Sequence, residues 1–246
     1  MDRIDIKGTR LESEGTALFE DGVALQPSIR RLKELSNVLL KKGFVNERNA
    51  EDPLYYVYRG AGLSKSPRFE EQRLRYDITV LERYDLGGEC NKTLGHYHSI
   101  AEKGMSYPEI YEVLQGEVLY VLQKKLPDSR MDVRLVRVPA GRRIVFPPNY
   151  GHISVNISDG ISISGNLVSM DYKADYDSII KMGGGAVYVL SDKTAVPNGA
   201  YPGVSVPEME DAPKEDFLGR GSVYDQFLDD PSRFEFLNRP SLLFKA

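Results

Sequence analysis

The sequence has few of the residues that mark several protein classes. Its 246 residues include one cysteine, Cys90, so no intrachain disulfide can form. No apolar run approaches the roughly 18 residues of a membrane-spanning helix, and the start, Met1 to Lys7, lacks the apolar stretch of a signal peptide. The net charge of −4 provides no basic field for nucleic acid. We therefore expect a cytoplasmic protein with neither nucleic-acid nor membrane partners.

The chain length and an ordinary composition favour one domain, residues 1–246. Residues 1–70 should hold N-terminal helix and strand elements, about 74–168 the core, and about 190–246 a C-terminal extension. Ser28 to Gly43 has the apolar spacing of an amphipathic helix, with Ser28 as N-cap and Gly43 just past its end. Residues 54–59 are typical of a strand, and 60–73 of a loop.

Short β runs follow, separated by turns rich in Gly, Pro, Asp and Ser. Because no helical periods lie between them, they indicate an all-β sandwich or small barrel. The expected strands cover residues 75–82, 109–114, 117–123, 132–138, 143–146, 152–157 and 161–168.

All three histidines fall in patterns typical of metal ligands. His96 and His98 would share one face of a strand, because successive side chains of a strand point to opposite faces. His152 follows a Pro-Pro segment, and Glu109 supplies a carboxylate. Such a mixed N/O set suits Fe2+, Mn2+, Co2+, Ni2+ or Zn2+. Four protein ligands leave room for substrate only on a five- or six-coordinate ion, which favours the octahedral metals.

These residues resemble the two cupin motifs. The first motif combines His-x-His with a glutamate that is followed, after six further residues, by a glycine; here these are Glu109 and Gly116. The second motif has its spacings matched at Gly141, Pro147, His152 and Asn156, with Asn149 in place of a glycine. Glu102 is the alternative acidic ligand, because it lies at the usual distance from His98. It sits in a turn-like stretch without the downstream glycine, so Glu109 is preferred.

The sequence further resembles the cupin-type glucose-6-phosphate isomerases over roughly residues 20–190. The matching segments are Thr93-Leu-Gly-His-Tyr-His98, Glu109-Ile-Tyr111 and the Pro-Pro run that ends at Asn156. The resemblance implies a double-stranded β-helix (jelly-roll) barrel with a few peripheral helices. It also implies a homodimer that interconverts glucose 6-phosphate and fructose 6-phosphate in glycolysis and gluconeogenesis.

The resemblance also implies roles for single residues. One divalent ion per subunit, with Fe2+ as the first candidate, would be bound by His96, His98, Glu109 and His152. The sugar phosphate would contact Thr79, Thr93, Gly95 and Tyr111, although Thr79 and Tyr111 could instead be barrel packing. Glu109 is the candidate catalytic base for a proton transfer, and a hydride shift between the two carbons is the other route.

Three departures from the family pattern concern the substrate contacts. The gap between His98 and Glu109 is longer, Asn149 stands where relatives carry another residue, and Tyr172 would replace a pocket tyrosine that falls near Val168. The same ligands would also serve another metal-dependent cupin, such as a dioxygenase, another sugar isomerase or an epimerase. A non-catalytic sugar-phosphate-binding cupin is the alternative outside enzymes. The apolar residues of the tail, among them Phe227 and Phe234, would cover either their own barrel or a partner subunit.

Overall fold

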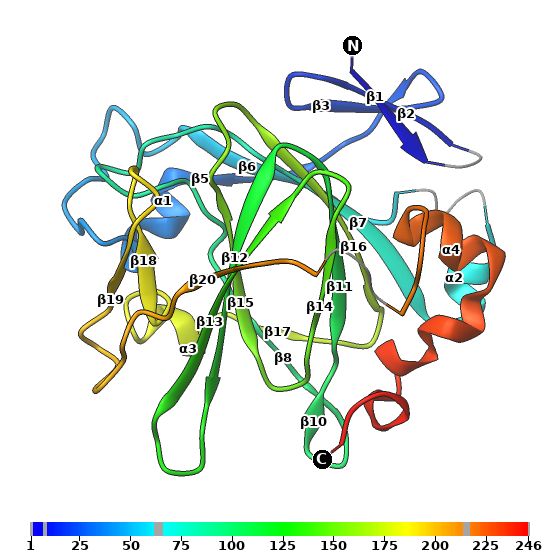
Figure 1. The fold of residues 1–246 in the computed structure, drawn as a ribbon. Helices are drawn as coiled ribbons and strands as arrows, with labels where there is room; N and C mark the ends of the chain where they lie inside the picture. Colours follow the sequence, from blue (N-terminus) through cyan, green and yellow to red (C-terminus); the bar gives the residue numbers. More distant parts are fainter. Residues whose placement is uncertain (1, 7–8, 62–65, 214–216, 246) are drawn as a thin grey trace.

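Two β-sheets face each other and enclose the core in a computed structural model that describes residues 2–6, 9–61, 66–213 and 217–245 (Figure 1). The smaller sheet has four strands, in the order β15 (Gly151–Asn156), β12 (Glu117–Lys125), β13 (Met131–Pro139) and β20 (Met209–Asp211). The larger sheet has six, in the order β14 (Arg143–Phe146), β11 (Glu109–Gln115), β16 (Ser162–Ser169), β7 (Leu74–Leu81), β6 (Pro53–Tyr58) and β5 (Ser28–Arg31). All neighbouring strands in these two sheets are antiparallel except β13 and β20.

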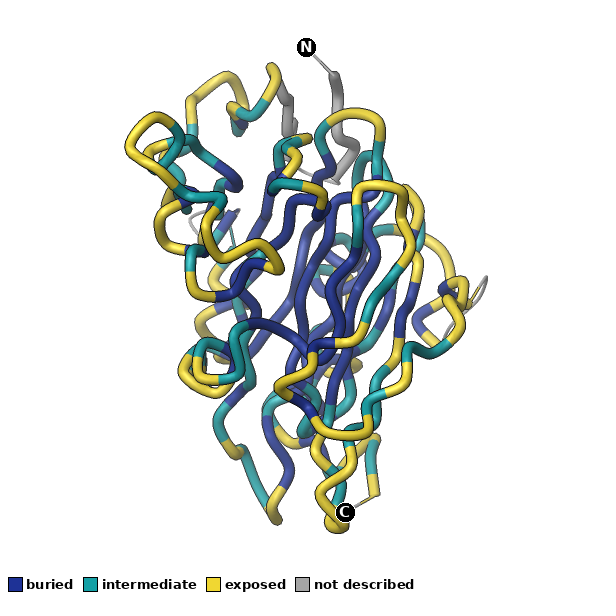
Figure 2. Tube along the Cα trace, turned by 90° about the vertical axis from the view of Figure 1, so that its left-hand side faces the viewer, coloured by how far each residue is buried: buried dark blue, intermediate teal, exposed yellow. Residues whose placement is uncertain are grey.

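Burial on both faces explains why β12 is almost continuously apolar. Its residues Val118, Tyr120 and Leu122 pack inside the barrel against β11 and β14. The alternate residues Leu119 and Val121 lie on the other face, under a cluster that includes Val187 and Val189. Strands buried on two sides lose the alternation of apolar and polar residues. Figure 2 shows the buried strands in the middle of the molecule and the exposed turns around them.

Shorter elements surround the barrel. The N-terminal segment forms a separate sheet of β1 (Asp2–Ile6), β2 (Thr9–Glu14), β3 (Ala17–Glu20) and β4 (Val23–Ala24). Other short strands are β8 (Tyr97–His98), β9 (Ile100–Glu102), β10 (Met105–Ser106), β17 (Ala174–Asp175), β18 (Val187–Val189) and β19 (Ala195–Pro197). The helical elements are α1 (Leu32–Leu35), η1 (Ser36–Val38), α2 (Arg68–Glu71), α3 (Asp177–Ile180), α4 (Val223–Asp229), η3 (Pro231–Leu237) and η4 (Pro240–Leu242).

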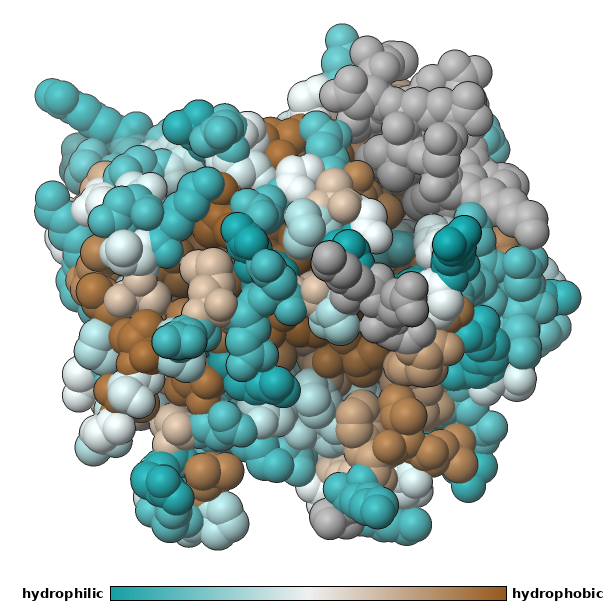
Figure 3. All heavy atoms as spheres, viewed as in Figure 1, coloured by the Kyte–Doolittle hydropathy of each residue, from teal (hydrophilic) through white to brown (hydrophobic). Residues whose placement is uncertain are grey.

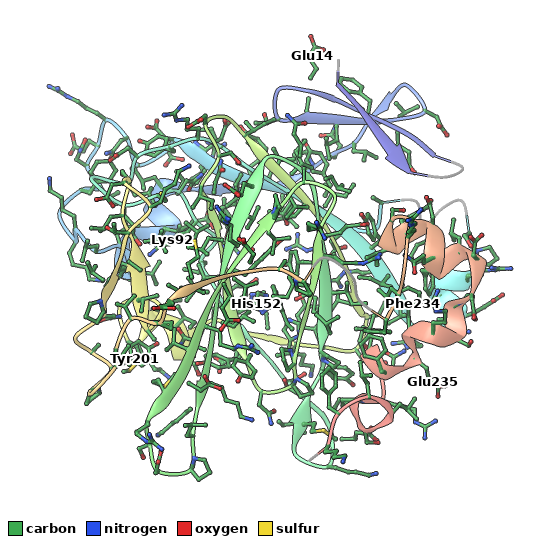
Figure 4. The ribbon with its side chains drawn as sticks, viewed as in Figure 1. Glu14, Lys92, His152, Tyr201, Phe234 and Glu235 are labelled. Carbon is green, nitrogen blue, oxygen red and sulfur yellow. The ribbon has the colours of Figure 1, made fainter. Side chains whose placement is uncertain are left out.

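The C-terminal extension covers the barrel of its own chain. Phe227 and Phe234 are fully buried, and they belong to the cluster that contains Tyr76 of β7 and Ile110 of β11. Figure 4 labels Phe234 beside α4 and η3, against the larger sheet. The tail aromatics therefore complete the hydrophobic core of one subunit.

The structure confirms the predicted all-β barrel with a few peripheral helices, and all seven strands expected between residues 75 and 168 are present. The predicted helix from Ser28 to Gly43 is wrong. Ser28–Arg31 is the edge strand β5, paired with β6, and helical structure covers only residues 32–38. Ser28 is not an N-cap, because α1 has Arg31 at that position; the Ser28 hydroxyl accepts from Arg59 instead.

The predicted loop at 60–73 is wrong in part. Residues 68–71 form α2, and residues 62–65 lie outside the described part of the chain. Phe69 of α2 is fully buried, with its ring centroid 4.6 Å from that of Phe227. No helix in the described ranges is long and apolar enough to cross a membrane.

Candidate metal centre

Four side chains from three parts of the chain converge inside the barrel. His96 and His152 lie on neighbouring segments, and each backbone N–H donates to the other residue's carbonyl, at 3.2 and 3.0 Å. His98 belongs to β8, and Glu109 is the first residue of β11. Tyr97 points to the opposite side of its segment and packs on Gly151, where an added Cβ would lie 2.6 Å from the Tyr97 ring. Figure 4 labels His152 near the centre of the barrel.

The ligand atoms of this group lie within contact distance. His96 Nε2 is 3.2 Å from His98 Nε2. The Oε2 atom of Glu109 is 3.5 Å from His98 Nε2 and 3.3 Å from His152 Nε2. One ligand nitrogen from each histidine lies within 4.8 Å of the other two. The structure therefore brings the four predicted ligands together.

Neighbouring groups orient two of the ligands. The Nδ1–H of His98 donates to the Tyr107 carbonyl at 2.9 Å, which directs the Nε2 lone pair at the centre of the group. Asn166 Nδ2 donates to Oε1 of Glu109 at 2.7 Å, which leaves Oε2 facing the histidines.

The donor set fits a divalent ion. Glu109 Oε2 and His152 Nε2 are buried and have no hydrogen-bond partner among the described residues. Buried polar atoms without a partner cost free energy, and native proteins nearly always satisfy them. An ion that accepts the lone pairs of three imidazoles and one carboxylate would satisfy both atoms.

Burial gives the imidazoles the protonation state that a metal requires. It lowers the pKa of His98 to about 4. It also places the pKa values of His96 and His152 well below their usual range, with the neighbouring imidazoles as the next cause. The histidines are therefore neutral at pH 7 and can donate lone pairs. Burial, followed by the Asp77 carboxylate, raises the pKa of Glu109 well above its ordinary value.

The four predicted substrate contacts line the same pocket as His96, Glu109 and His152. Thr79 of β7 is buried, and Thr93 Oγ1 accepts from Ser154 N at 3.0 Å. Gly95 has a φ of +79°, and a Cβ there would lie 2.5 Å from a side-chain carbon of Ile153, so no other residue fits without displacement. Tyr111 both lines the pocket and packs on Phe146, with ring centroids 4.9 Å apart.

Other residues that line the pocket were not predicted from the sequence, except Tyr172, which was named as the substitute for a pocket tyrosine. Tyr172, the expected substitute, places its ring 4.1 Å from that of His98, and the Arg75 guanidinium lies 5.4 Å from the centre of the Tyr172 ring. Asp77 is a buried carboxylate in strand β7, and its place between Tyr76 and Ile78 was a signal present in the sequence. The remaining ones are Tyr55, Val57, Arg59, Asn166 and Tyr176.

Glu102, the alternative acidic ligand, faces elsewhere. It belongs to β9, and its Oε1 accepts from Ser241 N at 2.9 Å. It does not line the pocket that contains His96, Glu109 and His152.

The family model and the curated relatives agree on one family. The family model described as glucose-6-phosphate isomerase matches residues 29–202. A glucose-6-phosphate isomerase of Thermococcus onnurineus is 29% identical over 155 residues, 63% of this chain and 76% of the relative. That of Pyrococcus furiosus is 29% identical over 174 residues, 67% of this chain and 82% of the relative. Among solved structures, a cupin-like protein from Thermotoga maritima overlaps 48% of this chain and 69% of its own, at 15% identity and a TM-score of 0.29.

Proposed function

The chain belongs to the glucose-6-phosphate isomerase family, and from this premise we propose that it interconverts glucose 6-phosphate and fructose 6-phosphate with one divalent metal ion per subunit. The observation that supports the metal is the convergence of three histidine nitrogens on the unpartnered Oε2 of Glu109. Fe2+ is the first candidate, and Mn2+, Ni2+, Co2+ and Zn2+ suit the same donors.

The reaction moves one hydrogen between C2 and C1 of the open-chain sugar and one between the two oxygens on these carbons. The ion, when bound, would supply Lewis-acid polarisation of the sugar's carbonyl oxygen. In the proposed route Glu109 takes the proton from C2 of glucose 6-phosphate and returns it to C1, and the reverse reaction uses the same carboxylate. Asn166 donates to Oε1 and keeps the carboxylate in place.

The other pocket residues position the sugar. Thr79 and Thr93 offer hydroxyls and Gly95 offers a backbone N–H to the phosphate, while Tyr111 and Tyr172 form walls beside His152 and His98. The rings of the two tyrosines exclude water from one side of the ligands.

The first experiment is conversion of fructose 6-phosphate to glucose 6-phosphate, coupled to NADP reduction by a glucose-6-phosphate dehydrogenase. We expect activity that EDTA abolishes and that one of the divalent metals restores. His152→Ala should lack this restorable activity. Folded, metal-loaded protein that converts neither sugar phosphate would overturn the proposal, and oxygen consumption would favour a dioxygenase.

A second measurement separates the two routes of hydrogen movement. Proton transfer through Glu109 exposes the hydrogen to exchange, so turnover in D2O should place deuterium at C2 of glucose 6-phosphate. Complete retention of the original hydrogen would favour the hydride shift.

We also propose that the protein is a cytoplasmic homodimer that acts in glycolysis and gluconeogenesis. Exposed apolar side chains of the C-terminal segment, Phe217, Leu242 and Leu243, support a contact between subunits. Apolar side chains gather over this segment at the lower right of Figure 3. Light scattering after gel filtration should give about twice 27.7 kDa, and a mass of one chain would contradict the dimer.

A further inference from the structure

Arg59 brings a positive charge to the wall of the metal pocket. It directly follows β6, on which Tyr55 and Val57 line the pocket, and the alternation of a strand places Arg59 on the same side. Among the described residues that line this pocket, Arg59 is the one lysine or arginine.

The guanidinium of Arg59 has N–H donors that are not used in hydrogen bonds among the described residues. Its Nη1 donates to the Ser28 hydroxyl at 2.8 Å. Within the described ranges no carboxylate lies at ion-pair distance from it, whereas Arg30 pairs with Glu34 at 2.7 Å and Arg75 pairs with Asp77 at 2.8 Å. A guanidinium has five N–H groups in a planar fork, so four remain for an anion.

The other described residues that line the pocket provide no net positive charge to balance the phosphate of a bound sugar phosphate. The residues expected to contact the phosphate, Thr79, Thr93 and Gly95, are uncharged. Glu109 is acidic, and the charge of Asp77 is balanced by Arg75. A phosphate placed among neutral donors and near a carboxylate is stabilised by charge-assisted hydrogen bonds from a guanidinium.

The strand register places Arg59 where it can share the phosphate with Thr79. Val57 pairs with Thr79 across β6 and β7, and Arg59 lies two residues further along the same face as Val57. A long arginine side chain spans the distance of one such step. The guanidinium and the Thr79 hydroxyl thus come from neighbouring strands and line one pocket.

We propose that Arg59 binds the phosphate of the substrate and thereby selects phosphorylated sugars over neutral ones. The inference rests on the proposed function, since that function supplies the sugar phosphate. The phosphate then lies at the β6 side of the pocket, and the carbonyl end of the sugar reaches the histidines. Arg59 acts in binding and in orientation, and takes no part in the transfer of hydrogen.

The test is titration calorimetry of metal-supplemented protein with 6-phosphogluconate and with gluconate, which differ by the phosphate. Loss of a hydrogen-bonded charge pair corresponds to about a 10- to 100-fold weakening of binding. Arg59→Gln should weaken the binding of 6-phosphogluconate by this factor and change the affinity for gluconate less than about 2-fold. Arg59→Lys keeps the charge, so it should lose less affinity for 6-phosphogluconate than Arg59→Gln. Arg134→Gln is the matched control, because Arg134 is an exposed arginine of β13 that faces Glu210. Arg134→Gln should leave the affinities for both ligands unchanged.

The same variants are then assayed for turnover of fructose 6-phosphate. Arg59→Gln should raise KM by a similar factor with little change in kcat, because the phosphate contact persists from substrate to transition state. Equal weakening of gluconate and 6-phosphogluconate, or an unchanged affinity for 6-phosphogluconate, overturns the inference. If the wild type binds 6-phosphogluconate through Arg59 but does not isomerise, the inference stands and the proposed function fails. If the wild type is active and Arg59→Gln is unaffected, the proposed function stands and the inference fails.

Discussion

Removal of the metal should lower the thermal stability of this protein, and His152→Ala should abolish that response. Without an ion, Glu109 Oε2 and His152 Nε2 are buried without hydrogen-bond partners among the described residues. An ion that binds these atoms therefore stabilises the folded chain and has no such site in the unfolded chain. At about 100 times its Kd, a ligand of this kind adds about 2.7 kcal/mol.

This free energy converts to a measurable shift. For a chain of 150–250 residues, 1 kcal/mol corresponds to about 2–4 °C in Tm. Metal added to chelator-treated wild type should therefore raise Tm by roughly 5–10 °C, as read by scanning calorimetry. The measured quantity is the difference in Tm with and without metal, so the cavity left by the truncated imidazole of His152→Ala cancels.

Asn91→Ala provides the matched control. Asn91 is buried and donates to the carbonyls of Leu54 and Glu82 at 2.7 and 2.9 Å. Its loss should cost about 1–3 kcal/mol and leave the metal-dependent shift intact. A wild type that responds to none of the five metals, or a His152→Ala variant with the full shift, would refute the assignment of these ligands.

Three further outcomes are expected. In chelator-treated protein, burial lowers the pKa of His98 from 6.5 to about 4. The unfolded chain binds a proton at His98 between these values that the folded chain excludes, so the contribution of His98 to stability should fall by roughly 3 kcal/mol as pH drops from 6.5 to 4. His96 and His152 add to the slope in the same direction, and His98→Gln should make the slope measured by urea titrations shallower. Glu109→Gln should lower kcat by about 10²- to 10⁴-fold in the coupled assay, with metal content measured in parallel. Glu112→Ala removes the acceptor of the first N–H of α4, at 2.8 Å, and should cost about 2–4 kcal/mol in a urea titration while the metal-dependent shift persists.

The barrel strands could be predicted because their signal is local. Alternation, β-branched residues and turn residues mark each strand between residues 75 and 168 within its own short segment. The error at Ser28–Arg31 has the opposite cause. This segment has helical spacing, but its hydrogen bonds are made with β6, where Ser28 pairs with Val57. Pairing with a distant strand overrides a local preference, and a single sequence does not reveal that partner.

The pocket residues also divide into those with a local sequence signal and those placed by pairing between distant strands. The candidate ligands stand in compact motifs. Spacing groups His96 with His98, and Glu109 is preferred to Glu102 because Gly116 follows it at the motif distance. Asn166, in contrast, reaches Glu109 because β16 pairs with β11, where Asn166 is opposite Tyr111. Register between strands decides which of their residues share a pocket, and register depends on contacts distant in sequence.

Two of the departures from the family pattern are bonded to each other. Asn149 stands where the cupin motif has glycine, and its φ of +70° is in the left-handed region that asparagine tolerates. A glycine would also adopt this conformation, but it has no side chain for the contacts that Asn149 makes. Its backbone N–H donates to Ser106 Oγ at 2.7 Å, and its Oδ1 accepts from Ser106 N at 2.9 Å. Ser106 lies in the long segment between His98 and Glu109, so Asn149 holds that segment against the loop before His152.

The C-terminal extension holds the same segment from its other side. Ser241 N donates to Glu102 of β9 at 2.9 Å, and the extension lies beyond residue 202, where the family match ends. Between these two attachments, Tyr107 presents its carbonyl to Nδ1 of His98. A long loop that was free to move would leave this imidazole without a fixed orientation, because the hydrogen bond to Nδ1 selects the tautomer that exposes Nε2. The longer loop, the asparagine and the extension are therefore connected by hydrogen bonds around the segment whose Tyr107 carbonyl orients His98 in the candidate metal centre.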